Sequence, residues 1–216
     1  IPGYVAVPVR SGTAQDAVAR MEAAPGPAAE RPVRMETIPF LSPTCAAPAR
    51  AGASEFSPDD PWFGLQWNLQ RTEVPAAWEI VRGDPSVVIA VLDEGVELGH
   101  PDLDLYPQSW NASADTPDGS PTGNHGTACA GVAAARLDNT AGVAGVAGGC
   151  RVMAIATATW ADVDIAEGIY FAVDNGARVI SMSFGVYPEW DVWDFDLVRD
   201  ALQYAYDKGV LLVAAS

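Results

Sequence analysis

The sequence predicts an α/β fold, a three-layer sandwich with a mainly parallel sheet, preceded by a small N-terminal appendage. Short apolar runs alternate with segments of helical periodicity along residues 59–216. Strands that alternate with helices form parallel sheets with right-handed crossovers. The first of these runs, Val87–Leu92, is apolar at every position, which is typical of a strand that is covered on both faces.

The N-terminal region differs in composition from the rest of the chain. Residues 1–41 predict a small strand–helix–strand segment, with strands over Tyr4–Val9 and Arg34–Phe40 and a short helix over Thr13–Ala24. Residues 42–58 are rich in Ala, Pro, Gly and Ser, which indicates a linker. The main domain is therefore expected to cover residues 59–216.

Helices and strands are expected in turn from residue 59 onward. The predicted helices cover Glu73–Val81, Gly126–Ala135, Ile165–Asn175 and Leu197–Lys208, and the predicted strands cover Val87–Leu92, Arg151–Ala156, Arg178–Ser183 and Val210–Ala214. Functional residues of parallel sheets lie at the carboxyl ends of the strands. Asp93 and Ser183 stand at two such ends.

Composition and charge exclude several functions. The net charge of −16 argues against nucleic-acid binding, because a phosphate-binding surface needs clustered Lys and Arg. No apolar run approaches the roughly 20 residues of a membrane span. The three cysteines, Cys45, Cys129 and Cys150, have no metal-type spacing, and they allow either one disulfide with one free thiol or three free thiols.

Asp93 and His125 are the candidate catalytic residues. Asp93 ends the strand Val87–Leu92, and His125 opens a helix of small residues. A carboxylate that holds an imidazole, which in turn acts as a general base, makes up two members of a nucleophilic hydrolase triad. The alternatives are a turn aspartate and a helix histidine without a task. The neighbouring Glu94 is expected to point to solvent.

The sequence resembles the subtilisin-like serine proteases, or subtilases, over most of its length. The matching motifs occur in the family's order, in Val91–Val96, His100–Leu103, Asn124–Thr127, Gly142–Ala147, Val179–Gly185 and Val210–Ala215. This resemblance implies a subtilisin-like sheet. It also implies hydrolysis of peptide bonds in peptide or protein substrates, with Asp93 and His125 as catalytic residues.

The catalytic serine of the family is not found in this sequence. In subtilases the oxyanion-hole asparagine follows a segment like Val213–Ser216, and the nucleophile lies further on, in a Gly-Thr-Ser motif. Ser181, Ser183 and Ser216 lack that context. The resemblance therefore predicts an incomplete sheet and, as a partner, a C-terminal remainder of the same protease. The alternative is an inactive pseudoprotease or peptide-binding module that uses the same cleft.

The resemblance also implies a substrate-binding strand and a cellular location. Ser183, Phe184 and Gly185 match the segment that lines the substrate backbone, and Trp160 lies in a loop that borders the cleft and is shorter than in many subtilases. A secreted or periplasmic location is favoured, with a cytoplasmic one as the alternative. Residues 1–41 resemble a short propeptide, or else form an extension packed on the catalytic domain.

A structural calcium ion is the cofactor that the resemblance implies. Its expected ligands are side-chain and backbone oxygens of Asp60, Asp102, Leu137, Asn139, Ala141 and Val143. Oxygen donors suit a hard cation that takes six to eight ligands. The alternative is an ordinary Asn-containing turn.

Cys129 lies one helical turn after His125, and a free cysteine beneath the histidine, as in some subtilases, is favoured over a zinc ligand.

Overall fold

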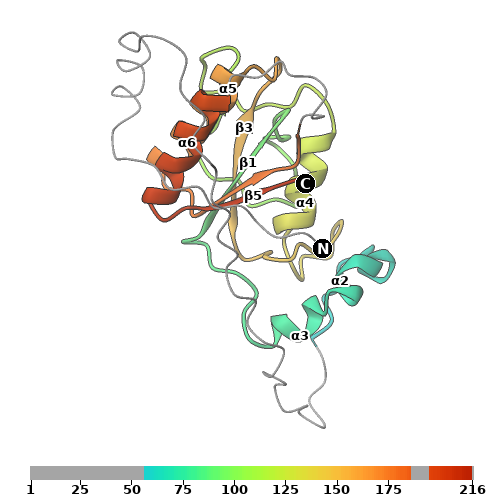
Figure 1. The fold of residues 1–216 in the computed structure, drawn as a ribbon. Helices are drawn as coiled ribbons and strands as arrows, with labels where there is room; N and C mark the ends of the chain where they lie inside the picture. Colours follow the sequence, from blue (N-terminus) through green and yellow to red (C-terminus); the bar gives the residue numbers. More distant parts are fainter. Residues whose placement is uncertain (1–55, 186–194, 216) are drawn as a thin grey trace, which may run out of the picture.

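A parallel sheet between helices forms the centre of the molecule. The computed structural model describes residues 56–185 and 195–215. Helix α4 (His125–Ala134) covers one face of the sheet, and α5 (Asp162–Asp174) with α6 (Phe195–Asp207) covers the other (Figure 1). The predicted segment 1–41 and most of the predicted linker lie outside the described residues.

The described sheet has five strands in the order β2-β3-β1-β4-β5, and each neighbouring pair is parallel. Their bounds are β1 Val88–Asp93, β2 Trp110–Asn111, β3 Arg151–Ala156, β4 Val179–Met182 and β5 Leu211–Ala214. The predicted three-layer α/β fold is confirmed. The short strand β2 was not predicted, because two residues give no readable period.

The packing of the central strand β1 on both faces explains why its sequence is apolar. Val88 and Leu92 pack in the core beneath α5 and α6, whereas Ile89 and Val91 pack in the core beneath α4. Successive side chains of a strand point to opposite faces, so a strand covered on both faces needs an apolar residue at each position. The only polar residue of β1 is its last, Asp93.

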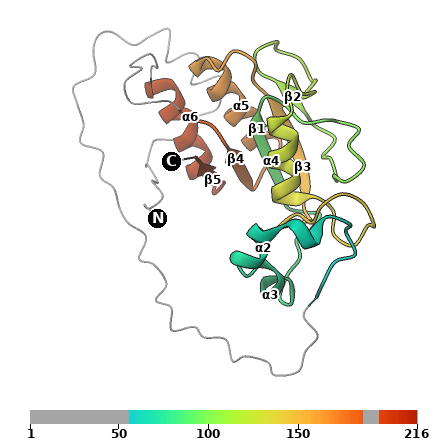
Figure 2. The same cartoon turned by 90° about the vertical axis from the view of Figure 1, so that its right-hand side faces the viewer.

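Two small helices and a 3₁₀ turn precede the sheet. They are η1 (Phe63–Leu65), α2 (Trp67–Arg71) and α3 (Val74–Trp78). Figure 2 shows α2 and α3 apart from the helices that cover the sheet. The predicted helix over Glu73–Val81 is shorter in the structure: it begins after Glu73, which takes a left-handed conformation and separates α2 from α3, and it ends at Trp78.

This helical region is hydrogen-bonded to the loop that follows α4. The side chain of Gln66 donates to the carbonyl of Ala144 and accepts its N–H, each over 2.8 Å. The indole of Trp78, itself buried, donates to the carbonyl of Val146 over 2.8 Å. None of the helices in the described part of the chain has the length and apolar character of a membrane span.

The buried core beneath α5 should dominate stability. Ile155→Ala removes a side chain that is 0% exposed, and we expect a loss of about 2–5 kcal/mol in the free energy of unfolding, because the cavity cannot close fully. Ile80→Ala is the matched control: Ile80 is 85% exposed, and its loss should stay below about 0.5 kcal/mol. Denaturant unfolding of the intact protein measures both, and equal effects would contradict the described packing.

Candidate active site

Asp93 and His125 are in direct contact at the carboxyl end of β1. The Nδ1 atom of His125 lies 2.9 Å from Oδ1 and 3.0 Å from Oδ2 of Asp93. The Asp93 carboxylate is buried and also accepts the backbone N–H of Glu94 over 2.8 Å. Since the proton on Nδ1 is held by the carboxylate, the neutral ring keeps a lone pair on Nε2 that can accept a proton.

Gly126 makes this contact sterically feasible. A Cβ atom at position 126 would overlap the carbonyl oxygen of Gly95 and come within 3.0 Å of the Cβ atom of Asp93. The absence of a side chain therefore lets the first turn of α4 lie directly on the end of β1. This is the physical reason for a glycine immediately after His125.

The charge of Asp93 changes the acid–base behaviour of His125. The hydrogen bond to Asp93 and the charge of its carboxylate raise the pKa of His125, the charge of Glu94 adds to this, and partial burial acts in the opposite direction. The side chain of His125 is 58% exposed, whereas that of Asp93 is 1% exposed. A buried carboxylate thus holds an imidazole that remains accessible to a reactant.

Cys129 lies beneath the imidazole. Its Sγ is 3.8 Å from each ring nitrogen of His125, and burial raises the pKa of the thiol, while a hydrogen bond with Ser183 acts in the opposite direction. Ligand atoms of Asp93, His125 and Cys129 all lie within 4.8 Å of one another. We assign this convergence to the hydrogen bonds of His125 rather than to a metal, because Nδ1 already binds the carboxylate. Within the described residues Cys129 and Cys150 are free, and Cys45 lies outside them.

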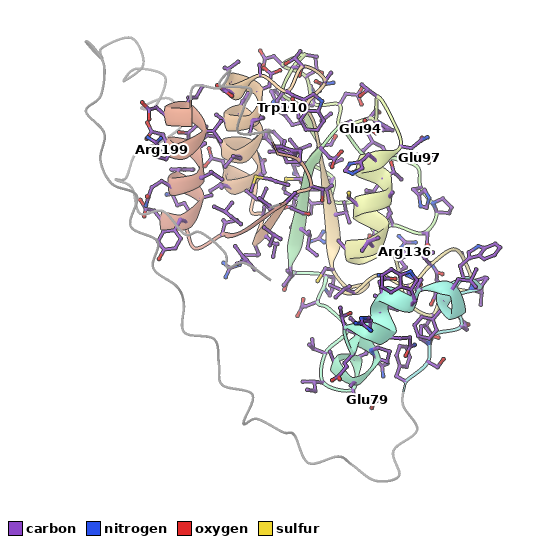
Figure 3. All side chains as sticks on the ribbon, turned by 45° about the vertical axis from the view of Figure 1, so that its right-hand side comes forward. Glu79, Glu94, Glu97, Trp110, Arg136 and Arg199 are labelled. Carbon is purple, nitrogen blue, oxygen red and sulfur yellow. The ribbon has the colours of Figure 1, made fainter. Side chains whose placement is uncertain are left out.

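Glu94 does not follow its predicted orientation. Its side chain is half-buried and its Oε1 atom accepts the backbone N–H of His125 over 2.6 Å. Figure 3 shows Glu94 beside the start of α4. The expectation that this side chain points to solvent is therefore wrong, because the free N–H groups of the helix start attract the carboxylate.

The predicted substrate-binding residues lie at the carboxyl ends of the strands. Ser183, Phe184 and Gly185 directly follow β4, the neighbour of β1 in the sheet. The ring of Phe184 lies 5.0 Å from the ring of Trp160, measured between centroids. The segment after β4 and the loop after β3 thus meet at the carboxyl ends of the strands, where Asp93 also lies.

Two residues that sequence reasoning missed hold the loop of Trp160. The hydroxyl of Ser113 donates to Asp164 over 2.6 Å and accepts the N–H of Ala158 over 2.9 Å. The hydroxyl of Thr159 also donates to Asp164. Asp164 could have been noted as an acidic residue in a first helical turn, but nothing in the sequence pairs it with Ser113.

Two predicted calcium residues, Asp60 before η1 and Asp102 after β1, are both hydrogen-bonded to the loop 137–143, which holds the others. Asp60 and Asp102 are 4% and 2% exposed. Asp60 accepts the N–H of Asp138 through Oδ2 over 3.0 Å, and its buried Oδ1 has no hydrogen-bond partner. Asp102 accepts the amide of Asn139 over 2.7 Å and the N–H of Val143 over 2.9 Å.

Burial and like charges act on Asp60 in this second cluster. Burial raises the pKa of Asp60, the N–H of Asp138 opposes that rise, and the negative charges of Asp102 and Asp59 add to it. Leu137 and Ala141 belong to the same loop, in which the N–H of Ala141 binds the side-chain oxygen of Asn139 over 2.9 Å. The loop therefore contacts two buried carboxylates and carries the side-chain amide of Asn139 beside one of them.

A parallel α/β sheet that brings a strand-end Asp to a helix-start His is the arrangement of the Asp–His half of a serine-hydrolase triad. Comparison with known sequences gives the particular family. Residues 84–216 match the subtilase family, Peptidase S8, and the chain belongs to this family.

Three subtilase relatives illustrate the similarity. The chain is 38% identical to thermitase from Thermoactinomyces vulgaris over 74% of its own length and 58% of the relative's. It is 32% identical to a calcium-dependent protease from a Nostoc species, over 68% of this chain and 26% of that protein. It is 34% identical to a halolysin-like extracellular serine protease from Natrialba magadii, over 59% and 26%. The chain spans at most 58% of the length of these relatives.

A solved structure supports the same fold. A protease from Pseudoalteromonas arctica superposes with a TM-score of 0.65 at 26% identity, and the match covers 74% of this chain and 58% of that one. The predicted resemblance to subtilisin-like proteases is thereby confirmed.

Loss of the Asp93 charge should lower the pKa of His125. In Asp93→Asn the side chain keeps its shape but no longer stabilises the imidazolium, so the ring should lose its proton at a lower pH than in the wild type. Histidine NMR titration of the intact protein measures this directly. Asp104→Asn, a half-exposed carboxylate paired with Arg136, is the control. An unchanged or higher His125 midpoint in Asp93→Asn would contradict the described pair.

Proposed function

We propose that this chain is the N-terminal part of the catalytic domain of a serine endopeptidase. The contact between Asp93 and His125 at the end of β1 is the single observation that carries the proposal. A binding module would have no need of a buried carboxylate that orients an exposed imidazole. The membership of the chain in the subtilase family supports the same conclusion.

In the proposed mechanism His125 is the general base. Its Nε2 removes the proton of a serine hydroxyl as the serine attacks the scissile carbonyl, and it later returns that proton to the leaving amine. Asp93 holds the ring in the tautomer with the proton on Nδ1 and stabilises the imidazolium that forms. The hydrogen bonds to both Asp93 oxygens are the geometry that this role needs.

The serine and the oxyanion-hole asparagine are proposed to come from a C-terminal remainder of the same protease. The subtilase relatives are longer than the part that this chain matches. Strand β5 forms one edge of the described sheet, and Leu211 on it is 61% exposed. An apolar strand of a parallel sheet is normally covered, so a further part of the protease is the expected neighbour of β5.

The proposed substrate is an extended peptide or protein segment. Ser183, Phe184 and Gly185 would offer their backbone to it, because a free strand end can pair with an added strand. Trp160 and Phe184 would supply apolar contacts, and their rings lie close together. Two subtilase relatives carry the word extracellular in their names, which supports a proposed secreted location.

Calcium is the proposed structural cofactor. The donor set fits, because Asp60 has a buried oxygen without a hydrogen-bond partner and lies close enough to Asp102 for the two charges to repel each other. Asp60, Asp102 and Asn139 would supply side-chain oxygens, and Leu137, Ala141 and Val143 would supply carbonyls. Bound calcium would neutralise the carboxylates of Asp60 and Asp102 and hold the segment around Asp60 against the loop 137–143. A calcium-dependent protease is among the relatives.

Replacement of either catalytic residue should abolish most of the activity. In the intact protease, His125→Ala or Asp93→Ala should lower kcat on the order of 10⁴-fold or more, with the fold retained. A chromogenic peptide substrate measures kcat, and circular dichroism checks the fold. Asp104→Ala is the control for loss of an acidic residue. A wild-type protein that binds peptide without cleaving it would instead favour the pseudoprotease or peptide-binding alternative.

Calcium removal should destabilise the protein. A ligand at about 1,000-fold over its Kd that binds only the native state stabilises it by roughly 4 kcal/mol. Chelation should therefore lower the melting temperature. Asp102→Ala should lose most of the calcium response, because the remaining oxygens carry too little charge to dehydrate the ion. The calcium proposal would be contradicted if the melting temperature is the same in chelator and in millimolar calcium, for wild type and Asp102→Ala alike. The loop 137–143 would then be an ordinary turn.

A further inference from the structure

The start of α4 receives a hydrogen-bond acceptor from the residue that follows strand β1. Asn124 stands at the N-cap position, but its side chain makes no capping hydrogen bond. The N–H of His125 is bound by the carboxylate of Glu94 instead, over 2.6 Å. Free N–H groups at a helix start favour a negative charge. Glu94, the residue that follows Asp93, thus binds the backbone of the same histidine whose ring Asp93 holds.

The surroundings of Glu94 fix it in this position. The N–H of Thr122 donates to the Glu94 carbonyl over 2.9 Å, which anchors the backbone. Any Cβ atom at position 123 would overlap the Glu94 carboxylate, so Gly123 leaves the space that the carboxylate occupies. Glu94 therefore links the end of β1, the loop before α4 and the first residue of α4.

Few charged groups act on the His125 ring within the described residues. Asp93 contacts it from the end of β1, Glu94 acts from the next residue, and Cys129 lies below it on α4. Burial raises the pKa of the Cys129 thiol, which therefore stays neutral near pH 7. The two consecutive carboxylates are thus the charges that favour the imidazolium.

We propose that Glu94 is a positioning residue for the reaction. Its hydrogen bond holds the first turn of α4, so that the ring of His125 stays against Asp93, and its charge shares in stabilising the imidazolium. This inference rests on the proposed function, because positioning matters only if His125 acts as a base. The Glu94 carboxylate thus has two roles: it accepts a hydrogen bond, and it supplies a negative charge. Different substitutions of Glu94 can test the two roles separately.

Three variants of the intact protease separate these roles. Glu94→Gln keeps an acceptor oxygen at the same reach but removes the charge. Glu94→Asp keeps the charge, but the side chain is one methylene too short for the contact. Glu94→Ala removes both. Glu97→Gln is the matched control, because Glu97 is an exposed glutamate near the same helix whose charge is not among those acting on His125 (Figure 3).

The pH profile of kcat/KM should show the charge role. Its acid limb reports the free enzyme's base, and a carboxylate that favours the imidazolium moves this limb to higher pH. In Glu94→Gln and Glu94→Ala the limb should therefore move to lower pH, whereas in Glu94→Asp and Glu97→Gln it should stay closer to the wild type. At the plateau, kcat should fall about tenfold in Glu94→Asp and Glu94→Ala, because the base is less well placed, but less than about twofold in Glu94→Gln.

A histidine NMR titration distinguishes the failure of this inference from that of the proposed function. It needs no catalysis, and the signal that disappears in His125→Ala is assigned to His125. The His125 midpoint should move to lower pH in Glu94→Gln. An inactive wild type with this midpoint shift would reject the peptidase but keep the contact. The role of Glu94 would be overturned if the wild type is active and Glu94→Ala changes neither the plateau kcat, nor the acid limb of kcat/KM, nor the His125 midpoint.

Discussion

The contact between the carboxyl end of β1 and the first turn of α4 is the constraint on which the site depends. Asp93 is buried, and an isolated buried carboxylate is costly unless hydrogen bonds compensate it. Its oxygens bind the His125 ring and the N–H of Glu94. Gly126 allows the helix to come close enough for this pairing. Without this close approach, the imidazole would lose the partner that sets its tautomer and its pKa.

The sheet supports that contact by burying Asp93, whereas the imidazole of His125 stays exposed. Apolar residues on both faces of β1 lock the strand between the helical layers, so Asp93 is held on a rigid element. Sites on rigid elements keep reactive groups within the narrow tolerances that catalysis needs. The cluster of Asp60 and Asp102 has the opposite character: burial and the negative charge of Asp102 raise the pKa of Asp60, and this is the place where calcium is proposed to bind.

The sequence allowed the central architecture to be predicted for a clear physical reason. Val88–Leu92 packs on both faces, so every position is apolar, and the pattern can be read without knowing what covers it. Asp93 and His125 could be predicted because each ends or begins an element. β2 and the break at Glu73 could not, because a two-residue strand has no period and a left-handed Glu has no sequence signal. Glu94 and Ser113 depend on partners distant in sequence, so only the fold shows their contacts.

Covalent labelling with a fluorophosphonate tests the central claim most directly. A fluorophosphonate reacts with a serine that a neighbouring base activates, so the label reports whether the Asp93–His125 pair serves a nucleophile. We predict that peptide mapping of the intact protease finds the label on one serine in a Gly-Thr-Ser segment outside residues 1–216. His125→Ala should react far more slowly. Labelling of Ser181 or Ser183, or labelling of His125→Ala at the wild-type rate, would contradict the account.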